Sequence, residues 1–220
     1  MRHTRSTTRG LAVALGAALG AGTLLTSTLA GAATAQQPAA ADRGAPAAAA
    51  AEDFVTGDEL PAHPDGWYSQ GPVDGLPEVP VFCYDTLLPA AGASHVAHWT
   101  ELDATATQVV LELDSESAAA DLAAVLDEAS TRCAGDWLAA NPGATASWDE
   151  LGEVPGADYS RVFGVYTAPE EAGHDVNLFA VLRDGSTVTV VRWGQMGTLS
   201  QAPVTEFLDT AEAAFARISD

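Results

Sequence analysis

The segment covering residues 175–197, DVNLFAVLRDGSTVTVVRWGQMG, constrains the fold of this chain more than any other. Two runs of apolar and β-branched residues flank Asp184-Gly185, a dipeptide that suits the type I′ turn of a two-residue β-hairpin. That turn would place Asn177 opposite Arg192. Both faces of the hairpin are largely apolar, which predicts an interior hairpin with other elements packed on each side.

Residues 1–35 have the pattern of a secretory signal peptide. Three arginines precede an apolar run over residues 10–30, and Ala33-Thr34-Ala35 forms an A-x-A cleavage signal, with Ala30-Gly31-Ala32 as the alternative. No arginine pair indicates the twin-arginine route, and no cysteine for lipid attachment follows the apolar run. We therefore expect Sec-type export, a secreted protein, and no membrane anchor after cleavage.

Residues 36–53 consist mostly of alanine and proline with a few polar residues, which predicts a disordered linker. Residues 54–220 are then long enough for a single domain with its own core.

The exported part is strongly acidic. All 30 carboxylates lie after residue 35, together with six of the nine arginines and no lysine, which leaves a formal net charge of −24. A chain with this charge is a poor partner for nucleic acid or for an anionic membrane surface. We expect neither partner, and we expect a monomer.

Cys83 and Cys133 are the only cysteines, and both lie in the exported part. Two cysteines in an oxidising compartment usually form a disulfide bond. No further ligands are spaced to complete a metal site around them, so we expect no metal and no cofactor.

The remaining periodicity predicts an α+β fold. The expected fold has a central antiparallel sheet of about six strands, with two main helices packed on one face and one disulfide. Alternation within the strand over residues 106–114 directs Val109 inward and Gln108 outward. The expected strands are residues 94–101, 106–114, 145–150, 158–168, 175–183 and 186–193. The expected helices are one that Ser115 or Ser117 caps and that runs to about Ala140, and one over residues 204–218.

The sequence contains no catalytic motif. It has no nucleophile elbow, no phosphate-binding loop, no dinucleotide fingerprint and no H-E-x-x-H. His95 and His98 have metal-ligand spacing only for a helix, whereas on a strand they would point to opposite faces. We therefore expect a non-enzymatic protein.

Arg192 is the most interesting polar residue of the hairpin. It lies at the end of the apolar face of the predicted strand. A cation in this position could bind a ligand carboxylate together with Asn177. The alternative, which the sequence favours, is a structural arginine paired with Asp175. Trp193 and Gln195 open the glycine-containing loop WGQMG, the expected rim of a cleft.

Three segments carry a resemblance to a known family. They are TVTVVRWGQMGTL, the following APVTEFLDTAEAAFARI, and ATQVVLELDS with the alanine-rich helix behind it. Together they resemble actinobacterial secreted proteins similar to the extracellular sensor domain of PknH-like serine/threonine kinases. The resemblance covers roughly residues 54–219 and implies an α+β fold with an antiparallel sheet, a cleft and a ligand-binding role.

These observations predict a secreted, non-enzymatic ligand-binding or sensor-like domain of the actinobacterial cell envelope, whose unknown partner is a small molecule or an envelope component. Two alternatives stay open. One is a secreted protein-interaction or inhibitor module that uses the acidic surface. The other is an extracellular hydrolase, which would need a buried carboxylate or histidine beside a nucleophile in one pocket.

Overall fold

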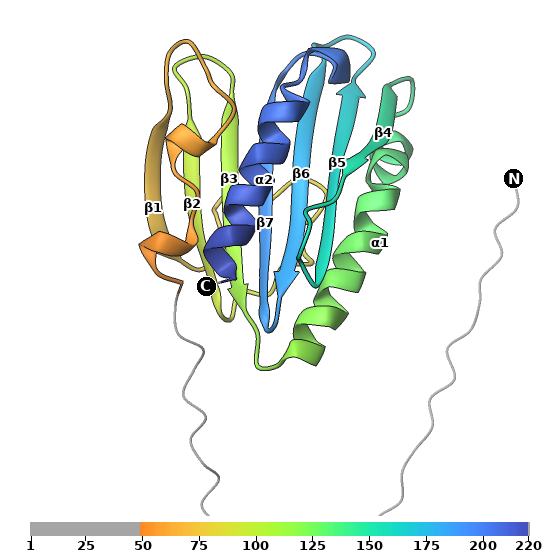
Figure 1. Ribbon diagram of the computed structural model, residues 1–220. Coiled ribbons are helices and arrows are strands. Elements are labelled where there is room, and N and C mark those ends of the chain that lie inside the picture. The colour runs from red at the N-terminus through yellow and green to blue at the C-terminus, as the bar shows by residue number, and fades with distance from the viewer. Residues whose placement is uncertain (1–48, 220) are drawn as a thin grey trace, which may run out of the picture. The chain divides into compact units, whose positions relative to one another are not determined.

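The computed structural model describes residues 49–219, so the predicted signal peptide and most of the predicted linker lie outside the described residues. The described chain contains one seven-stranded antiparallel sheet in the order β1-β2-β3-β7-β6-β5-β4 (Figure 1). Its strands are β1 (Tyr68–Asp74), β2 (Ala93–Trp99), β3 (Thr105–Glu112), β4 (Thr145–Gly152), β5 (Tyr159–Ala168), β6 (Asp175–Asp184) and β7 (Thr187–Met196). The helices are α1 (Glu116–Ala140) and α2 (Val204–Ile218), with short 3-10 turns η1 (Ala51–Asp53), η2 (Gly57–Glu59) and η3 (Leu199–Gln201).

The α+β class with an antiparallel sheet is confirmed, but the sheet has seven strands rather than six. The additional strand is β1, at one edge, inside a segment whose glycines and prolines indicate a loop. It pairs with β2 on both sides of an irregularity between Gln70 and Val73, where Gly71-Pro72 lies. Proline is tolerated in edge strands and at such irregularities because no ladder hydrogen bond is needed there.

The hairpin of β6 and β7 forms, with its register shifted by two residues from the predicted one. Asp184 pairs with Thr187, so the two-residue loop is Gly185-Ser186. Gly185 has a φ of 52° and Ser186 has no positive φ, which fits a turn with glycine first rather than type I′. Asn177 consequently pairs with Gly194 instead of Arg192. Because the shift is even, every side chain keeps its predicted face.

The two α-helices lie on opposite faces of the sheet, so the prediction that both share one face is wrong. Phe179 of β6 packs in one cluster with Leu126 of α1, whereas its neighbour Leu178 packs in another with Phe207 of α2. Alternate residues of a strand point to opposite faces, and both faces of β6 and β7 are apolar. Both apolar faces at the centre of the sheet must therefore be shielded from water by other elements. Figure 1 shows α2 crossing in front of the sheet.

Helix α1 has the predicted bounds and carries the predicted disulfide. Its N-cap is Ser115, whose Oγ accepts a hydrogen bond from the backbone N–H of Ala118 at 3.2 Å. Cys133 faces the core and is bonded to Cys83. None of the helices in residues 49–219 is long and apolar enough to cross a membrane.

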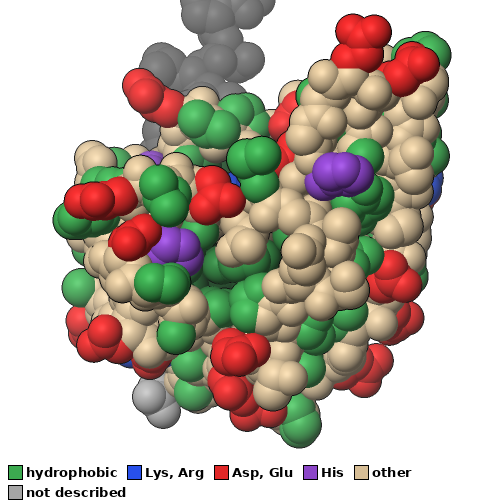
Figure 2. Space-filling view, turned by 90° about the horizontal axis from the view of Figure 1, so that it is seen from above, with side chains coloured by type: hydrophobic (Ala, Val, Ile, Leu, Met, Phe, Trp, Pro, Cys, Tyr) green, Lys and Arg blue, Asp and Glu red, His purple; other side chains and the backbone are tan. Residues whose placement is uncertain are grey.

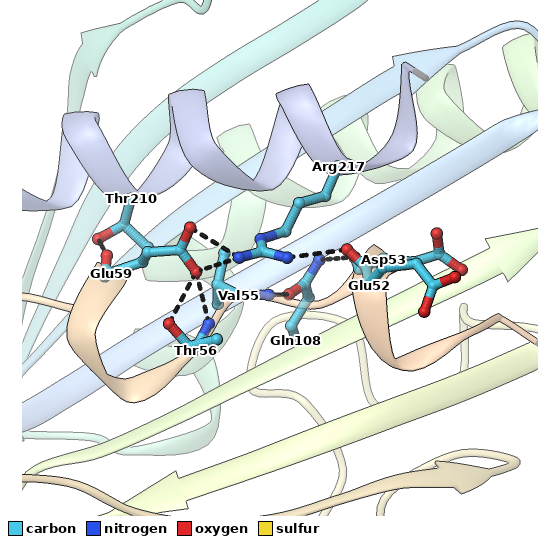
Figure 3. A network of polar contacts seen from close by, with 8 residues as sticks. All are labelled: Glu52, Asp53, Val55, Thr56, Glu59, Gln108, Thr210 and Arg217. Carbon is cyan, nitrogen blue, oxygen red and sulfur yellow. Dashed lines mark hydrogen bonds and ion pairs between the residues drawn. The ribbon is translucent and has the colours of Figure 1, made fainter.

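Residues 49–60 pack against β3 and α2 through a polar network (Figure 3). Gln108, predicted to point outward, is fully buried on the α2 side. Its Oε1 accepts from the backbone N–H of Val55 at 2.7 Å, and its Nε2 donates to the backbone oxygen of Asp53 at 3.2 Å. Arg217 of α2 donates to both carboxylate oxygens of Glu59 at 2.8 and 2.7 Å. The folded region thus includes the last residues of the segment predicted as linker.

Candidate functional site

Arg192 lies on the α1-side face of β7, near the end of the sheet where β6 begins and β7 ends. Its Nε donates to Oδ1 of Asn177 at 2.8 Å, and its Nη2 donates to the same oxygen. Its Nη1 donates to Oγ1 of Thr105 at 2.9 Å. These bonds use three of the five guanidinium N–H groups, so two remain for another acceptor.

Gly194 makes this arrangement possible. A Cβ atom at position 194 would collide with Nη2 of Arg192 and lie 2.7 Å from Oδ1 of Asn177. The absence of a side chain therefore leaves room for the guanidinium beside the backbone of Gly194. The sequence predicted a glycine-containing loop from residue 193, but residues 193–196 belong to β7, and the role of Gly194 is to leave space.

The partners of Arg192 are all neutral. It is the only arginine in residues 49–219 without a carboxylate oxygen within 4.0 Å, so the expected ion pair with Asp175 does not form. Burial lowers the pKa of Arg192, and the charge of Asp175 opposes that effect in part. The other described arginines all pair with acids: Arg132 with Glu128, Arg161 with Asp127, Arg183 with Asp158 and Arg217 with Glu59.

A cavity of about 350 Å³ opens beside Arg192 at this end of the sheet. Figure 2 looks onto this end and shows a hollow with hydrophobic side chains inside it and acidic side chains along the rim. Aromatic walls come from Phe82 and from Trp137 of α1, and the carboxylates of Asp103 and Asp175 lie on the lining. The cavity is within the usual size range of ligand sites.

A second cavity of about 550 Å³ lies on the other side of Arg192, over strands β1, β2 and β3. The two cavities share Arg192 and Thr105. The second is more apolar, with Val73, Leu76, Val79, Val81, Ala97 and Trp99 on its lining. Arg192 therefore lies between two cavities rather than at the end of a single cleft.

The structure brings together three of the four residues predicted for the site. Asn177, Arg192 and Gln195 line the first cavity. Trp193 does not, because it points to the opposite face, where it packs near α2 and is 2% exposed. Neighbouring residues within a strand point to opposite faces, so Trp193 points away from the face on which Arg192 lies.

Thr105 and Trp137 belong to the site but had no signal in the sequence. Thr105 reaches Arg192 because β3 pairs with β7, which brings Thr105 opposite Gly194. Trp137 reaches the first cavity because α1 ends there. Contacts between elements that are distant in the sequence bring these two residues to the site, and no local sequence pattern predicts such contacts.

The histidines form no metal site in the described chain. His95 and His98 point to opposite faces of β2, and residues 49–219 contain no group of three or more potential metal ligands. His98 is buried, and its Nδ1 lies 2.8 Å from Oγ of Ser69. Burial lowers the pKa of His98 to about 4, so its imidazole is a weak base near neutral pH. This Ser–His contact therefore gives the hydrolase alternative little support.

No family model and no curated protein matches the sequence. Among solved structures, the extracellular domain of PknH from Mycobacterium tuberculosis aligns with a TM-score of 0.40 and 11% identity, covering 67% of this chain and 84% of that one. The Ran-binding protein Mog1p of Saccharomyces cerevisiae aligns with a TM-score of 0.30 and 15% identity, covering 60% of this chain and 76% of that one. Likenesses this distant do not assign the chain to a family.

Proposed function

We propose that this chain is a secreted, non-enzymatic ligand-binding or sensor-like domain of the cell envelope, and that its ligand carries an anionic group bound by Arg192. The observation that carries this proposal is the unpaired guanidinium of Arg192 between two cavities. In a chain with 30 carboxylates, a partly buried arginine without an acidic partner is unexpected unless another anion binds it.

The geometry around Arg192 favours binding over a purely structural role. Asn177 and Thr105 fix the orientation of the guanidinium with neutral oxygens, and no described carboxylate oxygen lies within 4.0 Å of it. A preorganised guanidinium loses little side-chain entropy when a carboxylate arrives, and it can donate two N–H bonds to it.

The disulfide supports the proposed location. Cys83 and Cys133 are bonded, and disulfides persist mainly in oxidising compartments outside the cytoplasm. The disulfide and the predicted signal peptide support a location in the envelope or the medium.

The proposal is tested with the exported chain, residues 36–220, against a panel of small carboxylates and matched neutral amides. The unfolding temperature should rise in the presence of the carboxylates only, because a ligand that binds the folded state stabilises it by mass action. The variant Arg192→Gln should lose the shift. Arg183→Gln is the matched control, since Arg183 lies at the other end of the same hairpin and pairs with Asp158.

Two results would contradict the proposal. One is a panel in which no carboxylate stabilises the wild type. The other is a carboxylate shift that Arg192→Gln leaves intact. Isothermal titration of any compound that shifts the wild type gives the affinity and the stoichiometry directly.

A further inference from the structure

The second cavity is a groove that runs across the sheet from Arg192. Strand pairing places Arg192 opposite Thr107, Thr107 opposite Ala97, and Ala97 opposite Gln70. These four residues form one row across β7, β3, β2 and β1 on the α1-side face. Helix α1 contacts β4 to β7 and leaves this part of the face without a helical cover.

The segment over residues 76–81 covers the groove and is held at both ends. At one end the backbone N–H of Gly75 donates to the oxygen of Ala93 at 2.7 Å, and Nδ1 of His95 lies 2.8 Å from the Gly75 oxygen. At the other end Val81 is buried in the core. Between these anchors Val79 is 80% exposed. The groove is therefore formed before any ligand arrives.

The charged side chains that line the groove differ in sign between its two ends. Arg192 of β7 lies at one end of the groove and Asp74 of β1 at the other, and Glu78 of the covering segment also lines the groove. Beyond Arg192, the first cavity carries Asp103 and Asp175. A ligand can therefore place one negative charge at Arg192, but a second negative charge at either end would meet carboxylates.

We propose that this groove binds a free single-chain amphiphile with one carboxylate, such as a medium-chain fatty acid. The carboxylate binds the free N–H groups of Arg192, and the alkyl chain lies over Ala97 and Val73 beneath residues 76–81. This inference rests on the proposed function and specifies its ligand class. The monomeric acid is favoured over an anionic membrane surface because the exported chain carries a net charge of −24.

The test titrates the exported chain with hexanoate, octanoate and decanoate below their micellar concentrations. Affinity should rise about fifteenfold for every two carbons, because each buried methylene contributes about 0.8 kcal/mol. Decan-1-ol lacks the charge and should bind more weakly than decanoate. Decanedioate should also bind more weakly, because its second carboxylate would lie near Asp74 and Glu78.

Two matched variants test whether decanoate binds in the groove or elsewhere on the surface. Val79→Asp adds a negative charge to the groove at a side chain that is 80% exposed, so the fold should survive. It should weaken decanoate binding at least tenfold. Leu102→Asp makes the same change at a side chain that is 79% exposed and lines neither cavity, and it should leave the affinity unchanged.

The outcomes distinguish this inference from the proposed function. Arg192-dependent binding of carboxylates with no gain from chain length and no effect of Val79→Asp would overturn the groove and leave the proposed function standing. Absence of binding by every carboxylate would overturn both. Equal binding of decanol and decanoate, or association only with anionic phospholipid vesicles, would also overturn the inference.

Discussion

Arg192 and Asn177 are joined by two hydrogen bonds to a single amide oxygen, although 15 residues separate them in the sequence. The bond from Nε measures 2.8 Å. Asn177 lies on β6, two pairs further toward the open end of the hairpin than Arg192, and Gly194 leaves the space between them. The amide orients the guanidinium without neutralising it, and this is the relationship on which the proposed anion binding depends.

Replacing Asn177 with aspartate should abolish anion binding while keeping the fold. The new carboxylate would occupy the position of the amide oxygen and form an ion pair with Arg192, which removes the charge that attracts a ligand. Thermal stability should be equal to that of the wild type or higher. Titration with decanoate checks the affinity; retained binding by a folded Asn177→Asp protein would contradict the assigned role of Arg192.

Replacing Val190 with aspartate should unfold the domain. Val190 is fully buried and lies between Val109 and Val181 in the pairing of the three central strands. An unpaired carboxylate at that position would lose its hydration, which costs several kcal/mol in a domain whose net stability is about 5–15 kcal/mol. Circular dichroism of Val190→Asp should show loss of structure, whereas Leu102→Asp should give a wild-type spectrum.

The local features of this chain were readable from its sequence because each has a local cause. Ser115 begins α1 because a serine at that position caps the free N–H groups of the first turn. Asp184-Gly185 located the turn of the hairpin, although glycine alone needed the positive φ, so the predicted pairing was two residues out of register.

The features that the sequence did not reveal depend on long-range packing. Gln108 alternates like an outward residue, yet residues 53–55 cover it and supply its hydrogen-bond partners. Likewise, apolar residues on both faces of β6 indicate two covers, but periodicity does not say which helix takes which face. In the site, Arg192 was identifiable as a cation beside an apolar run, whereas Thr105 joins it only through the pairing of β3 with β7.

Removing the disulfide should destabilise the domain without changing its fold. The bond between Cys83 and Cys133 closes a loop with a sequence separation of 50 residues. In the chain-entropy treatment, a loop of this length contributes about 4 kcal/mol by restricting the unfolded chain. Urea unfolding of the variant Cys83→Ala/Cys133→Ala should show a lower midpoint. A midpoint equal to that of the oxidised wild type would contradict this account, and alkylation without reductant should modify no thiol in the wild type.

The pH dependence of stability should carry a contribution from His98. Burial lowers its pKa from 6.5 to about 4 in the folded state, so between these values the unfolded chain binds more protons than the folded one. The free energy of unfolding should therefore fall as the pH drops from about 6.5 to about 4, and the loss from this group should be complete below that range.

The variant His98→Asn isolates this contribution from the carboxylates. Asparagine can keep a polar contact with Ser69, whose Oγ lies 2.8 Å from Nδ1 of His98, but it does not titrate. Burial raises the pKa of Glu59, but hydrogen bonds from Thr56 and Arg217 outweigh this effect, so the pKa is lowered. The contribution of this carboxylate to the stability of the fold is lost as the pH falls below 4.5, in the wild type and in the variant alike. Urea unfolding across pH 4 to 7 should show that His98→Asn is less stable than the wild type at pH 7, with a difference that narrows toward pH 4. A constant difference across this range would mean that His98 is charged in the folded protein or exposed to water.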